Sequence, residues 1–162
     1  MSASTIHLKL DGIDGESNST QHKDEIDVES WSWGVSHAGA PAAGGGAAAG
    51  KPVFSDLTFT HRADRASPPL WKACASGKHI KNGTLSVAHA GAGTQDYLVI
   101  KLREVRVTSV TLADVESDAQ PPVESVTLSF TKVEYAYRPQ KPNGSLGPAV
   151  EFKFDIVANK ML

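Results

Sequence analysis

The chain has 162 residues, of which 40% are hydrophobic and 21% charged, and its formal net charge is -2. This length suits a single folded domain spanning residues 1–162, and the composition excludes a chain that is disordered throughout. The near-neutral charge argues against a dedicated nucleic-acid binder, and the single cysteine, Cys74, excludes an intrachain disulfide.

Two further features concern membranes and export. No apolar run approaches the roughly 20 residues of a membrane span. The first seven residues lack the basic and apolar stretches of a signal peptide. The sequence therefore predicts no stable membrane insertion and no export by a signal peptide.

Most of the chain alternates apolar and polar residues, as half-buried β-strands do. The alternating runs cover residues 6–10, 57–60, 84–88, 125–131 and 150–156. Longer runs change phase, between positions 28 and 31, between 130 and 133, and twice within 98–112. Since one slipped residue exchanges the two faces of a strand, these changes predict bulges or sharp bends.

Bent strands favour a mainly β fold built as a small antiparallel β-barrel. We expect one long bent strand over 98–112 and another over 125–138, because neither run contains Gly or Pro. The alternative is two shorter strands in each run with a turn between them.

One flanking α-helix is expected at about residues 67–76. Ser67 is a candidate N-cap, Pro68 fits the first turn, and Gly77 suits the left-handed residue that ends a helix. Cys74 would share a helix face with Leu70. We predict that it is a small buried hydrophobic residue and not a nucleophile.

An extended Ala/Gly loop is expected at residues 38–50, which contain only Ala, Gly and one Pro. Gly45, Gly50 and Lys51 have the spacing of a P-loop. However, Pro52 stands where that motif needs Ser or Thr to hold magnesium, and the following residues alternate as a strand, not a helix. We therefore predict no nucleotide cofactor.

No metal or catalytic pattern is evident. The histidines, at positions 7, 22, 37, 61, 79 and 89, form no i, i+4 pair and have no cysteine at metal-binding spacing, so we expect them to be scattered over the surface. No Gly-x-Ser-x-Gly elbow frames a serine, and the adjacent Ser36 and His37 would point to opposite faces of a strand. We predict no catalytic residues, no cofactor and no metal. An activity lost on substitution of Ser36 or His37 would revive the enzyme interpretation.

Two stretches stand out together, Trp-Ser-Trp-Gly at 31–34 and Ser-Gly-Lys-His at 76–79. They occur in order with Glu-Ile-Asp-Val-Glu-Ser at 25–30, the Ala/Gly loop ending in Gly50-Lys51, Asp-Leu-Thr-Phe-Thr at 56–60, Ser-Pro-Pro-Leu at 67–70, Val-Thr-Leu-Ser-Phe at 126–130 and Tyr-Arg-Pro-Gln at 137–140. From about residue 6 to 156, the chain closely resembles the Hcp family, the haemolysin-coregulated proteins of bacterial type VI secretion.

The resemblance implies a small antiparallel β-barrel with one flanking helix, assembled as homohexameric rings that stack into a hollow tube. Such a tube carries a spike protein, is driven out by a contractile sheath, and can hold secreted effectors in its lumen. This implies a structural subunit, not an enzyme, that assembles in the bacterial cytoplasm and is secreted through the type VI apparatus without a signal peptide. The alternative is a stand-alone β-barrel binding module for a small ligand, which would be a monomer.

Two sets of residues are candidates for contacts in such a ring. If Trp31 and Trp33 pack in the core, the small residues Ser30, Ser32 and Gly34 face the other way. We predict that this bare face lines the lumen and contacts effectors; the alternative is an ordinary exposed strand. The loop is predicted to reach a neighbouring ring and to order on stacking, with the candidate contacts Gly39, Gly44, Gly45, Gly46, Gly50 and Lys51. The long 98–112 run is a candidate for contact with a neighbour within the ring.

Overall fold

The protein is described by a computed structural model that covers residues 4–38, 50–90, 95–115 and 119–162. Within these residues the mainly β fold and its single helix are confirmed. The elements are β1 (Ser4–Leu10), β2 (Ile26–Val28), β3 (Ser30–Ser32), β4 (Val35–His37), β5 (Pro52–Phe54), β6 (Leu57–Arg62), α1 (Ser67–Ser76), β7 (His79–His89), β8 (Asp96–Ala113), β9 (Val123–Ser129), β10 (Lys132–Tyr137), β11 (Val150–Asp155) and β12 (Lys160–Met161).

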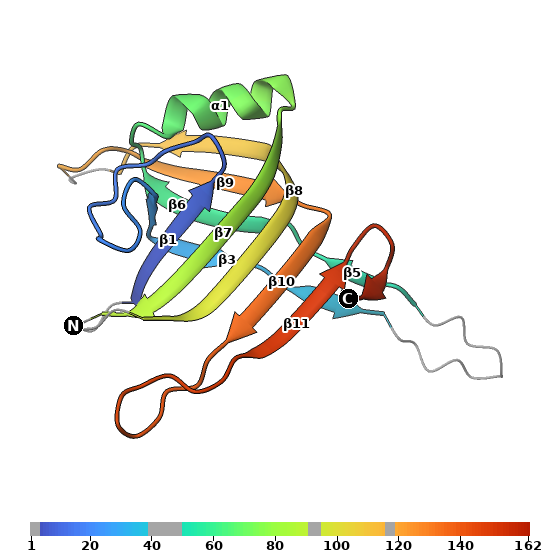
Figure 1. Ribbon diagram of the computed structural model, residues 1–162. Helices are drawn as coiled ribbons and strands as arrows, with labels where there is room; N and C mark the ends of the chain where they lie inside the picture. Colours follow the sequence, from blue (N-terminus) through green and yellow to red (C-terminus); the bar gives the residue numbers. More distant parts are fainter. Residues whose placement is uncertain (1–3, 39–49, 91–94, 116–118) are drawn as a thin grey trace.

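The long strand β8 is shared by both halves of an antiparallel sheet (Figure 1). Its first part lies between β7 and β10, and its last part pairs with β9. One arm of the sheet continues from β7 to β1 and β2, and the other continues from β9 to β6 and β3. The first part of β8 is therefore an interior strand, whereas residues 107–113 pair only with β9. The expectation that this run contacts a neighbour within the ring stays a prediction.

The predicted bends occur where the apolar pattern changes phase. Glu104, between the buried Leu102 and Val105, has a left-handed φ of 55°, and the register with β9 shifts between Val107 and Ser109. The run 98–112 is one bent strand, as predicted. The run 125–138 is divided into β9 and β10 at residues 130–131. Both pieces are antiparallel to β8, so the chain slips without reversing direction.

The two arms of the sheet meet again at residues 26–32. Only Glu29 separates β2 from β3, and its backbone N–H donates to the carbonyl of Thr60 at 2.8 Å. The sheet therefore curls round a common interior. The ladders between the named strands nevertheless stop short of full closure at this point, so the expected barrel is incomplete as a hydrogen-bonded ring.

The interior is filled by side chains from the inward faces of both arms. Its members with no exposed surface include Leu8, Ile26, Leu57, Phe59, Leu85, Leu102, Val126 and Leu128. Burying side chains of this size contributes about 1.5–3 kcal/mol each. Burial of this kind fixes which residues of each strand face outward, because a register slip would turn the apolar set to the solvent.

The helix α1 packs against β8, and Gly77 ends it in the left-handed conformation with φ 64°, as predicted. The predicted N-cap is one residue off, because Ala66 occupies that position and Ser67 is the first helical residue. The Ser67 hydroxyl instead accepts a hydrogen bond from the N–H of Asp64 at 3.0 Å. Cys74 is half-buried and packs against the core. Its expected full burial is therefore only partly met.

A second small sheet, the β4–β5 hairpin, extends away from α1 (Figure 1). Phe54 of β5 stacks on Trp33 with ring centroids 6.0 Å apart and contacts Phe154 of β11 at 5.0 Å. This aromatic cluster ties the hairpin to the β10–β11 extension of the main sheet.

The left-handed residue in β8 yields a prediction about stability. A β-branched side chain is strongly disfavoured at positive φ, so Glu104→Val should lower the free energy of unfolding by about 1–3 kcal/mol in urea denaturation. Glu104→Gly should lower the free energy of unfolding much less, because glycine tolerates this conformation. Equal losses for both variants would contradict the bend at this residue.

Candidate functional site

The two tryptophans near the start of the chain lie as the alternation predicts. Trp31 and Trp33 are half-buried and pack against the core, whereas Ser30, Ser32 and Gly34 are exposed. Trp33 lies in the aromatic cluster, with its ring centroid 6.1 Å from that of Phe130. These three small residues are therefore exposed in the single chain, and their place in a lumen stays a prediction.

This surface is larger than the sequence prediction, because neighbouring strands continue it. Ser30 pairs with Thr60 and Ser32 with Thr58 across β3 and β6, and β9 and the end of β8 extend both rows. We call the result the hydroxyl wall. Its members are Ser30, Ser32, Thr58, Thr60, Ser109, Thr111, Ser125 and Thr127. None of these side chains carries a charge.

Hydroxyl groups of the wall bond to one another across the strands. Ser30 Oγ lies 2.6 Å from Thr60 Oγ1, and Ser109 Oγ donates to Thr127 Oγ1 at 3.2 Å. Such cross-strand Ser/Thr pairs stabilise a sheet modestly, by about 0.2–1 kcal/mol each. The wall therefore offers a neutral and polar surface.

Gly34 lies beyond the end of β3 and begins the turn into β4. Its backbone N–H donates to Ser55 Oγ at 2.9 Å, and its carbonyl accepts from the N–H of Ser55. A Cβ at Gly34 would meet no atom within 4 Å, so the fold itself does not require glycine here.

The loop candidates Gly39, Gly44, Gly45 and Gly46 lie outside the described residues. Gly50, the last residue of the loop, and Lys51 are described and lie at the root of the β4–β5 hairpin. A Cβ at Gly50 would lie 2.5 Å from the carbonyl oxygen of Ala38, so close approach of two backbones requires glycine there. The close packing of the two backbones at the hairpin root therefore accounts for a glycine at position 50. Lys51 is exposed.

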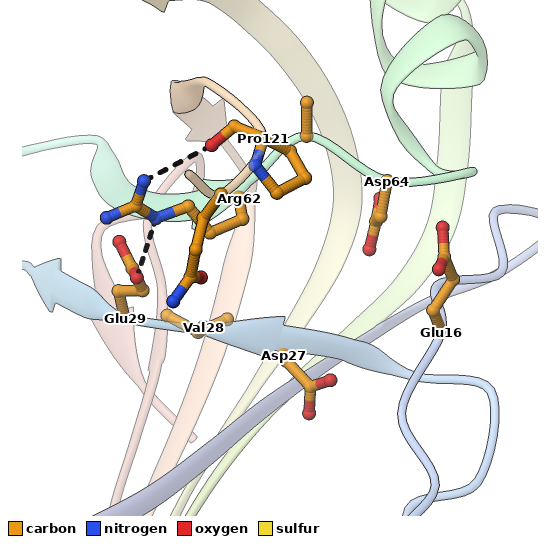
Figure 2. Close-up of a pocket in the computed structure, with 9 residues that line it drawn as sticks. Glu16, Asp27, Val28, Glu29, Arg62, Asp64 and Pro121 are labelled. Atoms are coloured by element: carbon orange, nitrogen blue, oxygen red, sulfur yellow. Dashed lines mark hydrogen bonds and ion pairs between the residues drawn. The ribbon is translucent and has the colours of Figure 1, made fainter. Parts of the chain in front are cut away.

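A cleft of about 390 Å³ opens at one end of the hydroxyl wall, and carboxylates dominate its lining. Figure 2 shows Arg62 between Glu29 and Pro121: its Nε donates to Glu29 Oε2 at 3.0 Å and its terminal nitrogen to the Pro121 carbonyl at 3.2 Å. Asp27 and Asp64 lie on the other side. A cleft of this charge suits a cationic group and not a phosphate.

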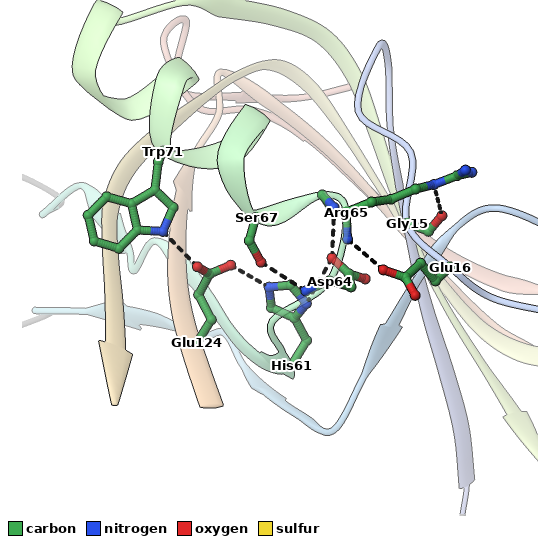
Figure 3. A network of polar contacts seen from close by, with 9 residues as sticks. Gly15, Glu16, His61, Asp64, Arg65, Ser67, Trp71 and Glu124 are labelled. Atoms are coloured by element: carbon green, nitrogen blue, oxygen red, sulfur yellow. Dashed lines mark hydrogen bonds and ion pairs between the residues drawn. The ribbon is translucent and has the colours of Figure 1, made fainter. Parts of the chain in front are cut away.

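Beneath α1 lies a buried polar network (Figure 3). His61 Nε2 is 2.7 Å from Glu124 Oε1, and the indole N–H of Trp71 donates to Glu124 Oε2 at 2.7 Å. His61 and Glu124 have no exposed surface. Burial raises the pKa of Asp64, which lies 3.8 Å from His61 Nδ1, although the N–H of Ala66 opposes the shift. The network fastens the half-exposed Trp71, and hence α1, to β6 and β9.

The expectation that all histidines are scattered on the surface is wrong. His7 and His61 are buried, and His22 is half-buried and stacks on His7 with ring centroids 4.7 Å apart. The alternation Leu57, Phe59, His61 would have placed His61 inside. His7 gave no such signal, because a loop covers its outward face.

The described part of the chain contains no group of three or more His, Cys, Asp or Glu side chains arranged to hold a metal ion. Ser36 and His37 are exposed on β4 and pair with Val53 and Pro52, which turns them to opposite faces of the hairpin. The same described residues include no helix that is both long and apolar enough to cross a membrane.

Comparison with known proteins agrees with this architecture. The sequence pattern of the family described as "Type VI secretion system effector, Hcp" matches residues 7–137. Protein hcp1 of Pseudomonas aeruginosa is 40% identical over 156 residues, which cover 95% of this chain and 96% of that protein.

Solved structures give the same result. The crystal structure of Hcp1 from Salmonella typhimurium superposes with a TM-score of 0.80 at 35% identity and covers 99% of both chains. A structure described as a type six secretion system protein reaches a TM-score of 0.92 at 26% identity and covers 99% of this chain and 100% of its own. The chain is thus a component of the bacterial type VI secretion system. It belongs to the Hcp family.

The buried network yields a second prediction. Trp71→Phe removes the indole N–H that donates to Glu124 and leaves a fully buried carboxylate oxygen without its hydrogen bond. The free energy of unfolding, measured in urea, should therefore fall by about 1–3 kcal/mol. Trp33→Phe is the matched control, because the indole N–H of Trp33 has no hydrogen-bond partner among the described residues. Both substitutions exchange an indole ring for a phenyl ring. If Trp33→Phe cost as much as Trp71→Phe, the anchoring role of the network would be wrong.

Proposed function

We propose that six copies of this chain close into a ring, and that the rings stack into the hollow inner tube of a type VI secretion system. The tube assembles in the bacterial cytoplasm, carries the spike protein, and is expelled by the contractile sheath without the use of a signal peptide. Effectors travel in its lumen. Family membership supports the type VI role. Three surfaces of the single chain support separate roles in lining the lumen, in stacking of rings and in contacts within a ring.

The neutral hydroxyl wall is the main support for the proposal that this face of the chain lines the lumen. Exposed strands elsewhere in this fold carry charge, such as Lys101 and Arg103 in the first part of β8. The wall carries only hydroxyl groups, several of which bond to one another across the strands. A neutral polar surface can contact varied effectors without binding any of them strongly, which suits a channel that must both retain and release its contents.

The β4–β5 hairpin supports a role in stacking. Its ladder runs as far as His37, directly before the Ala/Gly loop, and Pro52, two residues after its end. This ladder holds the two described ends of the loop together, which supports a loop that contacts a neighbouring ring. The small side chains of the loop allow backbones to approach closely.

A different surface supports contacts within the ring. Tyr137 and Val150 pair across β10 and β11 on the face that continues the core, and they are 43% and 69% exposed. Head-to-tail contacts of two different patches are the kind that close into rings. The packed interior gives little support to the alternative, a carrier with a small ligand inside its barrel, because Phe59 and Leu128 leave no exposed surface there.

The lumen assignment predicts the effect of a charge on the wall. Ser32→Arg should leave rings intact and reduce the amount of effector that co-purifies with them, because a large cation disrupts the neutral surface. Ser32→Thr, which keeps the hydroxyl group, should retain effectors. Ala75→Arg adds the same charge to an exposed position of α1 and serves as the control. Intact Ser32→Arg rings with unchanged effector retention would show that the wall does not face the lumen.

The stacking assignment predicts the effect of shortening the loop. Deletion of residues 40–48 joins Gly39 to Ala49 and leaves the β4–β5 ladder in place, so single rings should still form. Tubes should be lost, which negative-stain electron microscopy can measure directly. Tubes of normal length from the shortened chain would refute a stacking role for the loop.

A further inference from the structure

The segment of residues 11–25, between β1 and β2, is held against the sheet by a pair of stacked histidines. His22 lies in this segment. Its Nδ1 is 3.0 Å from Glu25 Oε1, and its Nε2 is 3.0 Å from Asp96 Oδ1 of β8. Because ionised carboxylates only accept hydrogen bonds, both ring nitrogens of His22 must carry protons to satisfy this geometry. The arrangement therefore fits an imidazolium.

His7 of β1 lies under the His22 ring and has a different environment. It is 3% exposed, and its Nε2 lies 3.2 Å from Asp27 Oδ1 of β2. The neighbouring strand β7 presents the uncharged Ser86 directly opposite it. A second imidazolium here would place two cations 4.7 Å apart in a largely buried site. The arrangement therefore fits a neutral His7.

We propose that His7 and His22 form a pH-sensitive clasp, which holds residues 11–25 most firmly near neutrality and loosens when the pH moves in either direction. The groups that face the pair are Asp27 from β2, Glu25 from the segment itself and Asp96 from β8. The inference concerns a single copy of the chain and does not depend on the proposed tube.

The burial and the charges around the two rings shift their pKa values in the directions that this geometry requires. Burial and the nearby His22 lower the pKa of His7 from 6.5, so its contribution to folding is lost as the pH falls below that value. Burial alone would lower the pKa of His22, but its hydrogen bonds to Asp96 and Glu25 outweigh burial and raise the pKa above 6.5. The contribution of His22 is therefore lost as the pH rises above 6.5.

The clasp also connects to the approach to α1. Arg65 Nε donates to the carbonyl of Gly15 at 2.7 Å, and its guanidinium pairs with Asp24 at 3.1 Å. The backbone N–H of Arg65 donates to Glu16. Loosening of the segment would therefore release the contacts on which the turn before the helix rests.

Nitrogen-15 NMR of the histidine rings in the whole protein tests the proposal, because it reports which ring nitrogens are protonated. At pH 6.5, His22 should be protonated on both nitrogens and His7 on one. His22 should lose its second proton only above that pH, and His7 should gain one only below it. A neutral His22 or a charged His7 at pH 6.5 would overturn the proposal.

Hydrogen exchange tests the clasp itself. The hydrogen-bonded amides of Gly15, Ser17 and Asp24 should be best protected near pH 6.5, after correction for intrinsic exchange. Their opening should increase on both sides, by up to about tenfold per pH unit for each proton involved. Asp96→Asn should weaken protection on the alkaline side, and His37→Gln, an exposed histidine on β4, should leave the profile unchanged. Protection that varies in one direction only, or an Asp96→Asn profile equal to that of the parent chain, would contradict the clasp.

Discussion

The slips in β8 are the constraint on which the rest of the fold depends. Glu104 adopts a left-handed conformation and the register shifts again after Val107, so a single strand can pair with β7 and β10 first and with β9 afterwards. Without these bends the two arms could not diverge from one strand and meet again at Glu29. The bends also keep the apolar residues of β8 facing inward as far as Val110, because each slip matches a change of phase in the sequence. Leu112, near the end of the strand, is exposed.

The same bends give the molecule two outer surfaces of different chemistry. The first part of β8 places Lys101 in a cross-strand row with Lys9, Thr84, Glu134 and Lys153. The last part contributes Ser109 and Thr111 to the hydroxyl wall. In a closed ring, opposite surfaces of a subunit meet different environments. The contrast between a charged surface and a neutral one is therefore the physical basis for assigning the neutral surface to the lumen.

Much of this fold could be predicted because it depends on local pattern. The alternation located the strands, the phase changes located the bends, and Gly77 marked the end of the helix. Ser30 and Ser32 were assigned to the correct face for the same reason. The full wall was not predictable, because Thr58, Ser109 and Thr127 join it through pairings between distant strands. The burial of His7 and the network of Glu124 with Trp71 were also missed, since covering loops and helix docking leave no periodic signal in the sequence.

We propose that copies of this chain form a ring whose channel is lined by the hydroxyl wall. Cryo-electron microscopy of the purified protein tests it most directly. The predicted result is a six-fold ring with an open centre, in which Ser32, Thr58 and Thr127 of every subunit face the channel. Single copies without ring formation, or rings in which these residues face outward, would contradict the account.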